Sequence, residues 1–348
     1  MTPTLKEINT EMITLARESR GLTQRDLASE MNLSEAKISL VEQQNQSFTD
    51  EDVKRLSKML NYPVSFFYQK GDAFLPSMIN FRKRLKVAHK VLFPIEATSN
   101  LYRLQLETLL EKVKLPAPSF PKLKVTLETS PSEIAKKVRK DWNLGNLPID
   151  NLTEQLEKRN ILVVRFDFDT DRVDSRTLIT KTGHPLIILN KRLLGDRQRF
   201  SLAYELGHIL MHHFTESMNG DADHRANLFA AELLMPEAEI KKDMKGDVGL
   251  NLLALLKKKW KVSMQALLYR ASDLELITYN QKRYLISQFN TLKIRKREPQ
   301  ELDVPIEKPL LVRSLVTKYR SATGLSVKEM AGMMHLFEDE FIERFANN

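Results

Sequence analysis

The sequence contains no cysteine, which excludes disulfide bonds and metal sites built from thiolates. It also lacks any apolar run long enough to span a bilayer, and its first residues do not follow the basic-then-apolar order of a secretory signal. Internal repeats and low-complexity tracts are absent as well. These absences predict a soluble, cytoplasmic protein that has no membrane partner.

What the chain has in excess is positive charge, with a formal net charge of +9 over 348 residues. A basic balance suits an anionic partner such as nucleic acid. The first 70 residues, however, contain nine Lys or Arg and ten Asp or Glu, so the excess lies further along. Four basic runs occur there: Arg82–Lys90, Lys136–Lys140, Lys257–Lys261 and Lys293–Arg297. Each run alone is more typical of a solvated helix face, so charge indicates nucleic-acid binding without locating it.

The N-terminal residues carry the local signals of short helices separated by tight turns. We expect a first helix over about Leu5–Arg20, ended by Gly21. Thr23, Ser34 and Thr49 each precede an apolar-periodic stretch, and we expect them to cap the helices that follow. A short fifth helix is expected to begin at Pro63.

The rest of the chain mixes β-rich runs with longer helical stretches. We expect Pro94 to begin a new helical segment, over about Ile95–Lys114, and the Pro-rich residues 114–122 to form a linker. Three β-rich runs have the length of strands: Ile161–Phe168, Arg176–Thr182 and Pro185–Leu189. After Asp247 we expect helices to the end, with a break around Glu298–Pro309. The predicted fold class is therefore multidomain and mainly α, with one small β-sheet (α+β).

Residues 23–43, TQRDLASEMNLSEAKISLVEQ, place two short helices around a tight turn, an arrangement that suits insertion into the major groove. This segment resembles the lambda-repressor-like (XRE-type) helix-turn-helix of bacterial and phage regulators. The resemblance implies an all-α domain that binds double-stranded DNA and uses Gln24 to hold a phosphate. It also implies that bases are read by the start of the second helix, through Ser34, Glu35, Ala36 and Ser39, and that Lys37 contacts either a base or a phosphate. Helical periodicity alone would equally allow a small domain for protein–protein contacts.

The predicted base-reading residues carry little positive charge. Glu35 can accept a hydrogen bond from cytosine, but its carboxylate repels phosphate. We therefore expect DNA affinity to depend on dimerisation, or on the basic run FRKRLK at Phe81–Lys86 contacting the DNA backbone.

Residues 204–208 read YELGH, one residue short of a zinc-peptidase helix. In the motif HExxH, two His residues on one helical face bind zinc, and the Glu acts as general base. Glu205 and His208 keep these positions here, but Tyr204 replaces the first His. A phenol has a pKa of about 10 and must lose its proton to bind a metal well.

The surrounding sequence resembles the ImmA/IrrE metallopeptidase family over about Pro131–Pro309. Three segments carry the resemblance: GDRQRFSLAYELGHILMHH, DHRANLFAAELLMP and KWKVSMQALLYRA. It implies a zincin-like metallopeptidase domain, and many members of this family are encoded with, or fused to, such DNA-binding domains. It also implies that Asp223 takes the place of the family's third ligand, usually Glu, and that Glu205 is the catalytic base if the domain is active.

Three interpretations of this site remain open. In the first, the site is vestigial and the domain senses a ligand or a partner. In the second, zinc binds through a shifted set, because His208 and His212 also lie four residues apart and Asp223 or His224 could complete the set. In the third, an active enzyme uses Tyr204 as an unusual ligand. Zinc is thus a candidate cofactor, which we expect to be weakly bound or absent.

We expect four regions in the chain. Residues 1–70 form the helix-turn-helix domain, 71–130 a helical connector with a Pro-rich linker, 131–300 the degenerate metallopeptidase-like domain, and 301–348 a C-terminal helical segment. The predicted function is a repressor-like transcriptional regulator that binds DNA as a homodimer and responds to a small-molecule effector or a regulatory protein. The alternatives are an active zinc endopeptidase that cleaves a regulator or itself, and an antitoxin-type regulator that binds a partner protein. The missing His favours a pseudoenzyme.

Overall fold

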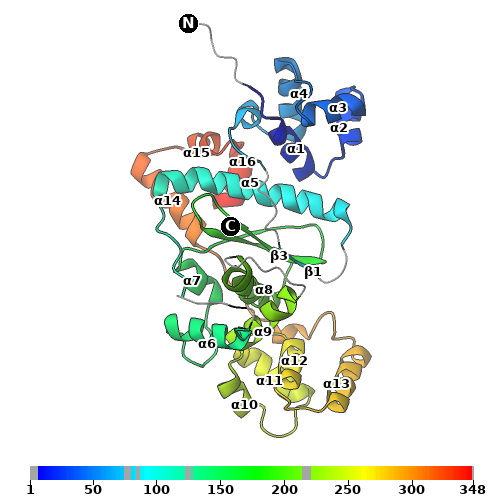
Figure 1. Cartoon of the computed structure of the whole chain (residues 1–348), viewed down its shortest axis with the longest axis vertical. Helices are drawn as coiled ribbons and strands as arrows, with labels where there is room; N and C mark the ends of the chain where they lie inside the picture. The colour runs from blue at the N-terminus through cyan, green and yellow to red at the C-terminus, as the bar shows by residue number, and fades with distance from the viewer. Residues whose placement is uncertain are drawn as a thin grey trace.

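The computed structural model describes residues 7–73, 80–83, 87–121, 126, 128–213 and 221–346. Helices dominate, and one four-stranded sheet lies near the middle of the molecule (Figure 1). Residues 10–60 form helices at one end of the long axis, and residues 237–291 form helices at the other. The prediction of a mainly α protein with a small β-sheet is confirmed. Within the described residues, no helix is both long and apolar enough to cross a membrane.

The N-terminal helices follow their local capping signals. They are α1 (Thr10–Ser19), α2 (Gln24–Met31), α3 (Glu35–Glu42), α4 (Asp50–Leu60) and the 3-10 helix η1 (Val64–Tyr68). Thr23 and Thr49 each form a capping box with the Asp three residues later, and the Ser34 side chain caps α3. The predicted start of the first helix at Leu5 is wrong, because Asn9 caps α1 with its side chain and the helix begins at Thr10.

Pro94 lies inside a long helix, α5 (His89–Val113), so the prediction that it begins a new segment is wrong. A proline near the start of a helix removes only one backbone hydrogen bond, to the carbonyl four residues earlier. Thirteen residues of α5 beyond Pro94 are buried, and this burial outweighs the lost bond. Ala97 and Leu101 pack in the N-terminal core, whereas Leu106 and Leu109 pack in the core beside the sheet. Helix α5 therefore connects the N-terminal helices to the sheet.

The sheet has the strand order β1-β3-β4-β2. Its strands are β1 (Asn80–Lys83), β2 (Leu162–Phe166), β3 (Val173–Ile179) and β4 (Pro185–Asn190). Strands β2 and β4 are parallel, and the other two pairs are antiparallel. The three predicted β-rich runs correspond to β2, β3 and β4.

Strand β1 lies within residues 71–130, which were expected to form a helical connector with a linker, so the sequence did not predict this strand. Residues 80–83 pair with the outer edge of β3, where they satisfy backbone groups that would otherwise lack partners in the sheet. The first residues of the FRKRLK run thus form the edge of the central sheet, and residues 84–86 lie outside the described residues.

Alternate strand residues face two different cores, as the period of a β-strand requires. Val163 and Ile187 pack toward a helical layer, whereas Leu162 and Ile188 pack toward the opposite layer. The first layer contains α6 (Pro131–Asp141), α7 (Leu152–Glu157), α8 (Gly195–His208) and α9 (Ala222–Leu234). The second contains α5, α14 (Leu311–Thr323), α15 (Val327–Met333), α16 (Glu338–Phe341) and the π-helix η4 (Ile342–Ala346). The C-terminal segment therefore packs on the sheet.

Helix α8 is fixed at both ends by glycines that allow close contacts. A Cβ added to Gly195 would lie 2.2 Å from the carbonyl oxygen of Val304, and one added to Gly207 would lie 2.9 Å from the Phe229 ring. Beyond α9 follow α10 (Glu237–Asp243), α11 (Leu250–Trp260), α12 (Met264–Asp273), α13 (Tyr279–Thr291) and the 3-10 helix η3 (Gln300–Leu302). A π-helical turn, η2 (Ile209–His213), extends α8.

Candidate functional site

The close packing of α8 on α9 brings Tyr204, His208 and Asp223 together. The Tyr204 hydroxyl donates a hydrogen bond to Asp223 Oδ1 at 2.5 Å, and His208 Nε2 lies 3.5 Å from the same oxygen. The Tyr204 and His208 rings meet edge to face with centroids 4.6 Å apart. All three residues of the predicted degenerate ligand set therefore converge on one carboxylate oxygen.

These three side chains differ in their access to solvent. Tyr204 and His208 are each 3% exposed, whereas the Asp223 side chain is 82% exposed. Tyr204 and Asp223 line a cavity of about 930 Å³ between α8, α9, α12 and residues 295–298. Of the residues described, neither Glu205 nor His208 belongs to its lining. Tyr204 and Asp223 therefore face the cavity, whereas the His208 side chain does not line it.

Glu205 points toward the sheet. Its two carboxylate oxygens accept hydrogen bonds from the hydroxyls of Ser175 at 2.6 Å and Thr177 at 2.7 Å, both on β3, and the side chain is fully buried. A general base needs an oxygen in reach of the water or substrate that it deprotonates. In this arrangement Glu205 instead links α8 to the sheet through two hydrogen bonds. Sequence reasoning missed both hydroxyl partners.

The residues around Asp223 fit a zinc ion poorly. Zinc sites of peptidases use three protein ligands with one position open to water. The Tyr204 hydroxyl donates its hydrogen bond to Asp223, so the unmodified ligands offered here are one imidazole and one carboxylate. Within the described residues, no group of three or more His, Asp or Glu side chains is placed to hold a metal ion. In the alternative set His208, His212 and His224, the His212 side chain lies outside the described residues, and His224 is an exposed residue of the cavity wall.

In the helix-turn-helix, Gln24 belongs to a network that ties three helices together. Its Nε2 donates to Glu42 Oε2 at 2.7 Å, and Arg17 Nε donates to Glu42 Oε1 at 2.6 Å. The side chains of Arg17 and Glu42 are nearly buried, so this ion pair helps to hold α1 and α3 together. The amide nitrogen of Gln24 carries a second hydrogen, so this side chain can still donate to a phosphate.

The predicted base-reading residues lie at the start of α3. Ser34, Glu35 and Ala36 are exposed, and Lys37 and Ser39 are half-buried. Glu35 Oε2 lies 3.2 Å from Nε of Arg25 on α2, in an ion pair exposed to solvent. Arg25 therefore offsets the charge that Glu35 would present to phosphate. Sequence reasoning missed Arg25 as a partner, because it lies on the other helix of the pair, ten residues from Glu35.

Comparison with known families matches the chain in two places. A helix-turn-helix family model matches residues 13–67, and a model of the IrrE N-terminal-like domain, a Peptidase_M78 family, matches residues 156–272. The first match begins within α1, covers α2–α4 and ends within η1, and the second contains both the YELGH segment and Asp223. The chain thus joins a DNA-binding helix-turn-helix to a metallopeptidase-like domain of IrrE type, which confirms the predicted fusion. A search of curated proteins finds no match.

Proposed function

We propose that this protein is a repressor-like transcriptional regulator in which the IrrE-like domain senses a ligand or partner and does not cut peptides. The observation that carries the proposal is the 2.5 Å hydrogen bond between Tyr204 and Asp223. It places a protonated phenol on the carboxylate that would otherwise bind metal. The hydrogen bonds from Ser175 and Thr177 to Glu205 support the same conclusion, because they occupy the oxygens of the expected base.

The DNA-binding half of the proposal rests on α2 and α3. The exposed start of α3 and the available donor of Gln24 support a mode in which α3 enters the major groove and α2 contacts the backbone. We propose that two copies of the chain bind two half-sites, since one copy offers few cations at α3. The homodimer, the base-reading residues and the domain limits at residues 70, 130 and 300 are parts of this proposal.

The sensing half needs a physical connection from the cavity to the DNA-binding helices. Such a connection runs from Tyr204 on α8 through Glu205 to β3. From β3 it continues to α5, because Arg176 pairs with Glu96 at 3.3 Å. Helix α5 then packs in the core of the N-terminal helices. A ligand that moves α8 relative to the sheet would therefore shift the helices that hold α3, which is the coupling a regulator requires.

Selection of bound duplexes from a random DNA library tests the proposal. We expect the full chain to enrich a short operator, and we expect a metal chelator to leave its affinity unchanged. The Lys37→Glu variant should lose the enriched operator, whereas the exposed control Lys328→Glu on α15 should retain it. Cleavage of the chain or of a co-purifying protein that stops with chelator and in Glu205→Ala would contradict the sensor assignment.

A further inference from the structure

Residues 276–297, which include α13, form a run without any acidic residue. They contain six Lys or Arg and no Asp or Glu, where the average of this chain would give about three acidic residues. The cations are Lys282, Arg283, Lys293, Arg295, Lys296 and Arg297. We call the exposed part of this run, together with Tyr269, the basic tyrosine surface.

The cations of this surface are largely unneutralised. Arg297 pairs with Asp303, and Lys282 lies near enough to Asp273 to act on the pKa of that carboxyl. Within the described residues, however, no carboxylate lies in ion-pair distance of Lys282 or of the other four cations. On the neighbouring helix α11, by comparison, Lys257 and Lys259 each pair with carboxylates. Because solvated helix faces usually mix both signs, this excess of one sign indicates an anionic partner.

Exposed tyrosines accompany these cations. Tyr279 is 72% exposed and Tyr284 64% exposed, both on α13. Arg283 lies over the ring of Tyr279, and Lys282 Nζ lies 4.6 Å from the centroid of the Tyr269 ring. Cations beside exposed rings, among neutral Asn, Gln, Ser and Thr side chains, offer what nucleic acids bind: charge for phosphates and flat faces for sugars and bases.

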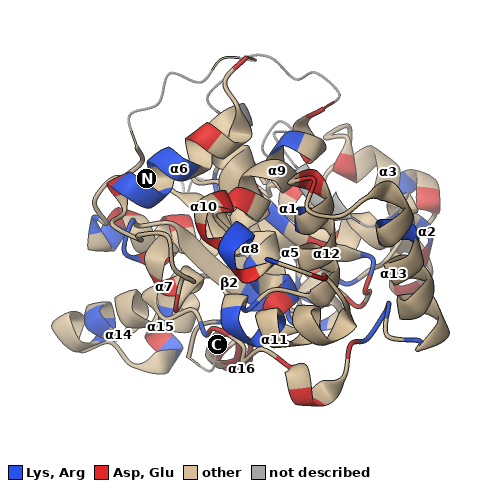
Figure 2. Cartoon of the chain, turned by 90° about the horizontal axis from the view of Figure 1, so that it is seen from below, with Lys and Arg blue, Asp and Glu red and all other residues tan. Residues whose placement is uncertain are grey.

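This surface lies far from the helix-turn-helix. Figure 1 places α13 at one end of the long axis and α2 and α3 at the other. Figure 2 views the molecule from the α13 end, with Lys and Arg in blue and Asp and Glu in red. A DNA segment held by this surface would therefore differ from the segment that α3 reads.

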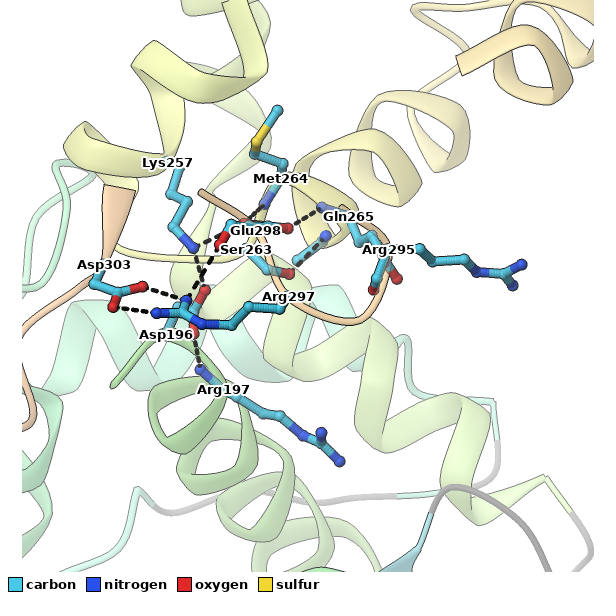
Figure 3. A network of polar contacts seen from close by, with 11 residues as sticks. Asp196, Arg197, Lys257, Ser263, Met264, Gln265, Arg295, Arg297, Glu298 and Asp303 are labelled. Atoms are coloured by element: carbon cyan, nitrogen blue, oxygen red, sulfur yellow. Dashed lines mark hydrogen bonds and ion pairs between the residues drawn. The ribbon is translucent and has the colours of Figure 1, made fainter. Parts of the chain in front are cut away.

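The basic residues 293–297, which follow α13, are anchored by the next residue, Glu298. The buried Glu298 accepts hydrogen bonds from Lys257 Nζ at 2.7 Å and from the Met264 backbone nitrogen at 3.1 Å, and Lys257 also bonds Asp196 at 2.6 Å. Gln265 donates to the Arg295 carbonyl oxygen. In Figure 3 the Arg295 side chain points away from this network. These hydrogen bonds thus fix the backbone of residues 295–298, while the Arg295 guanidinium stays available to a partner.

We propose that the basic tyrosine surface binds the phosphate backbone of a second DNA segment, independently of sequence. The charge complementarity carries this choice of partner, since a DNA duplex repeats a phosphate charge all along its length. A regulator with DNA sites at both ends can bridge two duplexes. This extends the function beyond operator recognition by α3.

The test uses the full chain with α3 disabled by Ala36→Glu and Lys37→Glu, so that only the second surface remains. Binding of a random-sequence duplex is measured over a range of salt concentrations. In this background, Lys293→Gln with Lys296→Gln should weaken binding about tenfold and lower the slope of log affinity against log salt by about two. The matched control is Lys136→Gln with Lys140→Gln on α6, which removes the same charge from exposed positions and should change neither quantity.

Three results would overturn the proposal. The first is that the α3-disabled chain fails to bind DNA at low salt. The second is that the Lys293→Gln/Lys296→Gln variant and the α6 control weaken binding equally, which would mean that net charge alone causes the effect. The third is that polyglutamate of matched charge displaces the duplex with equal affinity, which would assign the surface to an acidic polypeptide. A failure of α3 to recognise an operator would leave these measurements unaffected, so the two proposals are tested separately.

Discussion

We propose that the phenol of Tyr204 limits how the IrrE-like domain can hold a metal. Tyr204 occupies the position of the first His in HExxH, and its hydroxyl donates to the carboxylate that the family pattern uses as a ligand. His208 lies on the same carboxylate oxygen at 3.5 Å. We propose that the backbone arrangement of a zinc site is retained, while its chemistry is changed at Tyr204, which replaces the first His, and more mildly at Asp223, which replaces the family's usual Glu.

Restoring the imidazole should restore the metal. Tyr204→His places a second His one helical turn before His208 and frees Asp223 from the phenol, which gives three ligands of the type zinc prefers. We expect about one zinc per chain by elemental analysis of this variant. Tyr204→Phe, which also frees Asp223 but adds no ligand, is the matched control. Zinc contents that are equal in the two variants would mean that the ligand geometry has changed beyond this residue.

Glu205 is predicted to stabilise the fold. Glu205→Gln replaces an oxygen that accepts from Ser175 or Thr177 with a donor, so one charge-assisted hydrogen bond is lost inside the core. We expect the free energy of unfolding to fall by about 2 kcal/mol in urea denaturation. The exposed Glu301→Gln serves as control and should leave stability unchanged. Equal stability of both variants would remove the structural role of Glu205.

At this scale the sequence predicts positions better than contacts. Helical spacing and family resemblance pointed to Tyr204, His208 and Asp223, and the structure brings them together. The hydroxyl partners of Glu205 lie 30 and 28 residues away on a strand, and the register of that strand follows from sheet packing. No local pattern encodes such a contact.

At the scale of elements, the helix-turn-helix could be predicted because its helices begin at local capping signals. Thr23 and Thr49 form capping boxes within four residues of sequence. Strand β1 and the continuous helix through Pro94 could not be predicted, because both depend on distant partners: the edge of β3 and the two cores that bury α5. Local signals set the start of an element, and tertiary burial decides whether it continues.

The capping boxes predict an acid dependence of stability. The side-chain hydrogen bond from Thr23 lowers the pKa of Asp26; for Asp52, burial acts to raise the pKa, but the hydrogen bonds from Thr49 outweigh it and lower the pKa. A carboxylate with a lowered pKa in the folded state stabilises the fold above its unfolded pKa, and this stability is lost as pH falls through the folded pKa.

Thermal unfolding between about pH 5 and pH 3 checks this expectation. Wild-type protein should lose melting temperature more steeply over this range than the variant Asp26→Asn/Asp52→Asn, which has no charge to lose at either cap. Parallel curves for the two proteins would show that these caps contribute no acid dependence.

The N-terminus of α8 should be intolerant of any side chain at Gly195. A Cβ there would lie 2.2 Å from the Val304 carbonyl oxygen and 2.6 Å from that of Pro305, so the backbone of that segment must move. We expect Gly195→Ala to cost about 2 kcal/mol or more in the free energy of unfolding. Gly332→Ala in α15, where a Cβ meets nothing within 4 Å, is the control and should be neutral or slightly stabilising. A neutral Gly195→Ala would contradict the tight contact.

At the scale of the whole molecule, buried structure connects the N-terminal helices to the sheet beside the proposed sensing site. Helix α5 packs in both the N-terminal core and the sheet core. The C-terminal segment also contacts the N-terminal helices: Arg20 pairs with Glu340 at 3.4 Å, and Ser65 hydrogen-bonds to His335 at 3.1 Å. Binding in the cavity beside Tyr204 can therefore reach the DNA-binding helices through packed elements. This arrangement is the physical basis on which we propose a sensor.

The zinc content of the unmodified protein, grown with ample zinc, tests the central claim most directly. Elemental analysis should find far less than one zinc per chain in protein that still binds its selected operator. One tightly held zinc per chain, lost in His208→Ala together with a proteolytic activity, would contradict the account and make the protein a working peptidase.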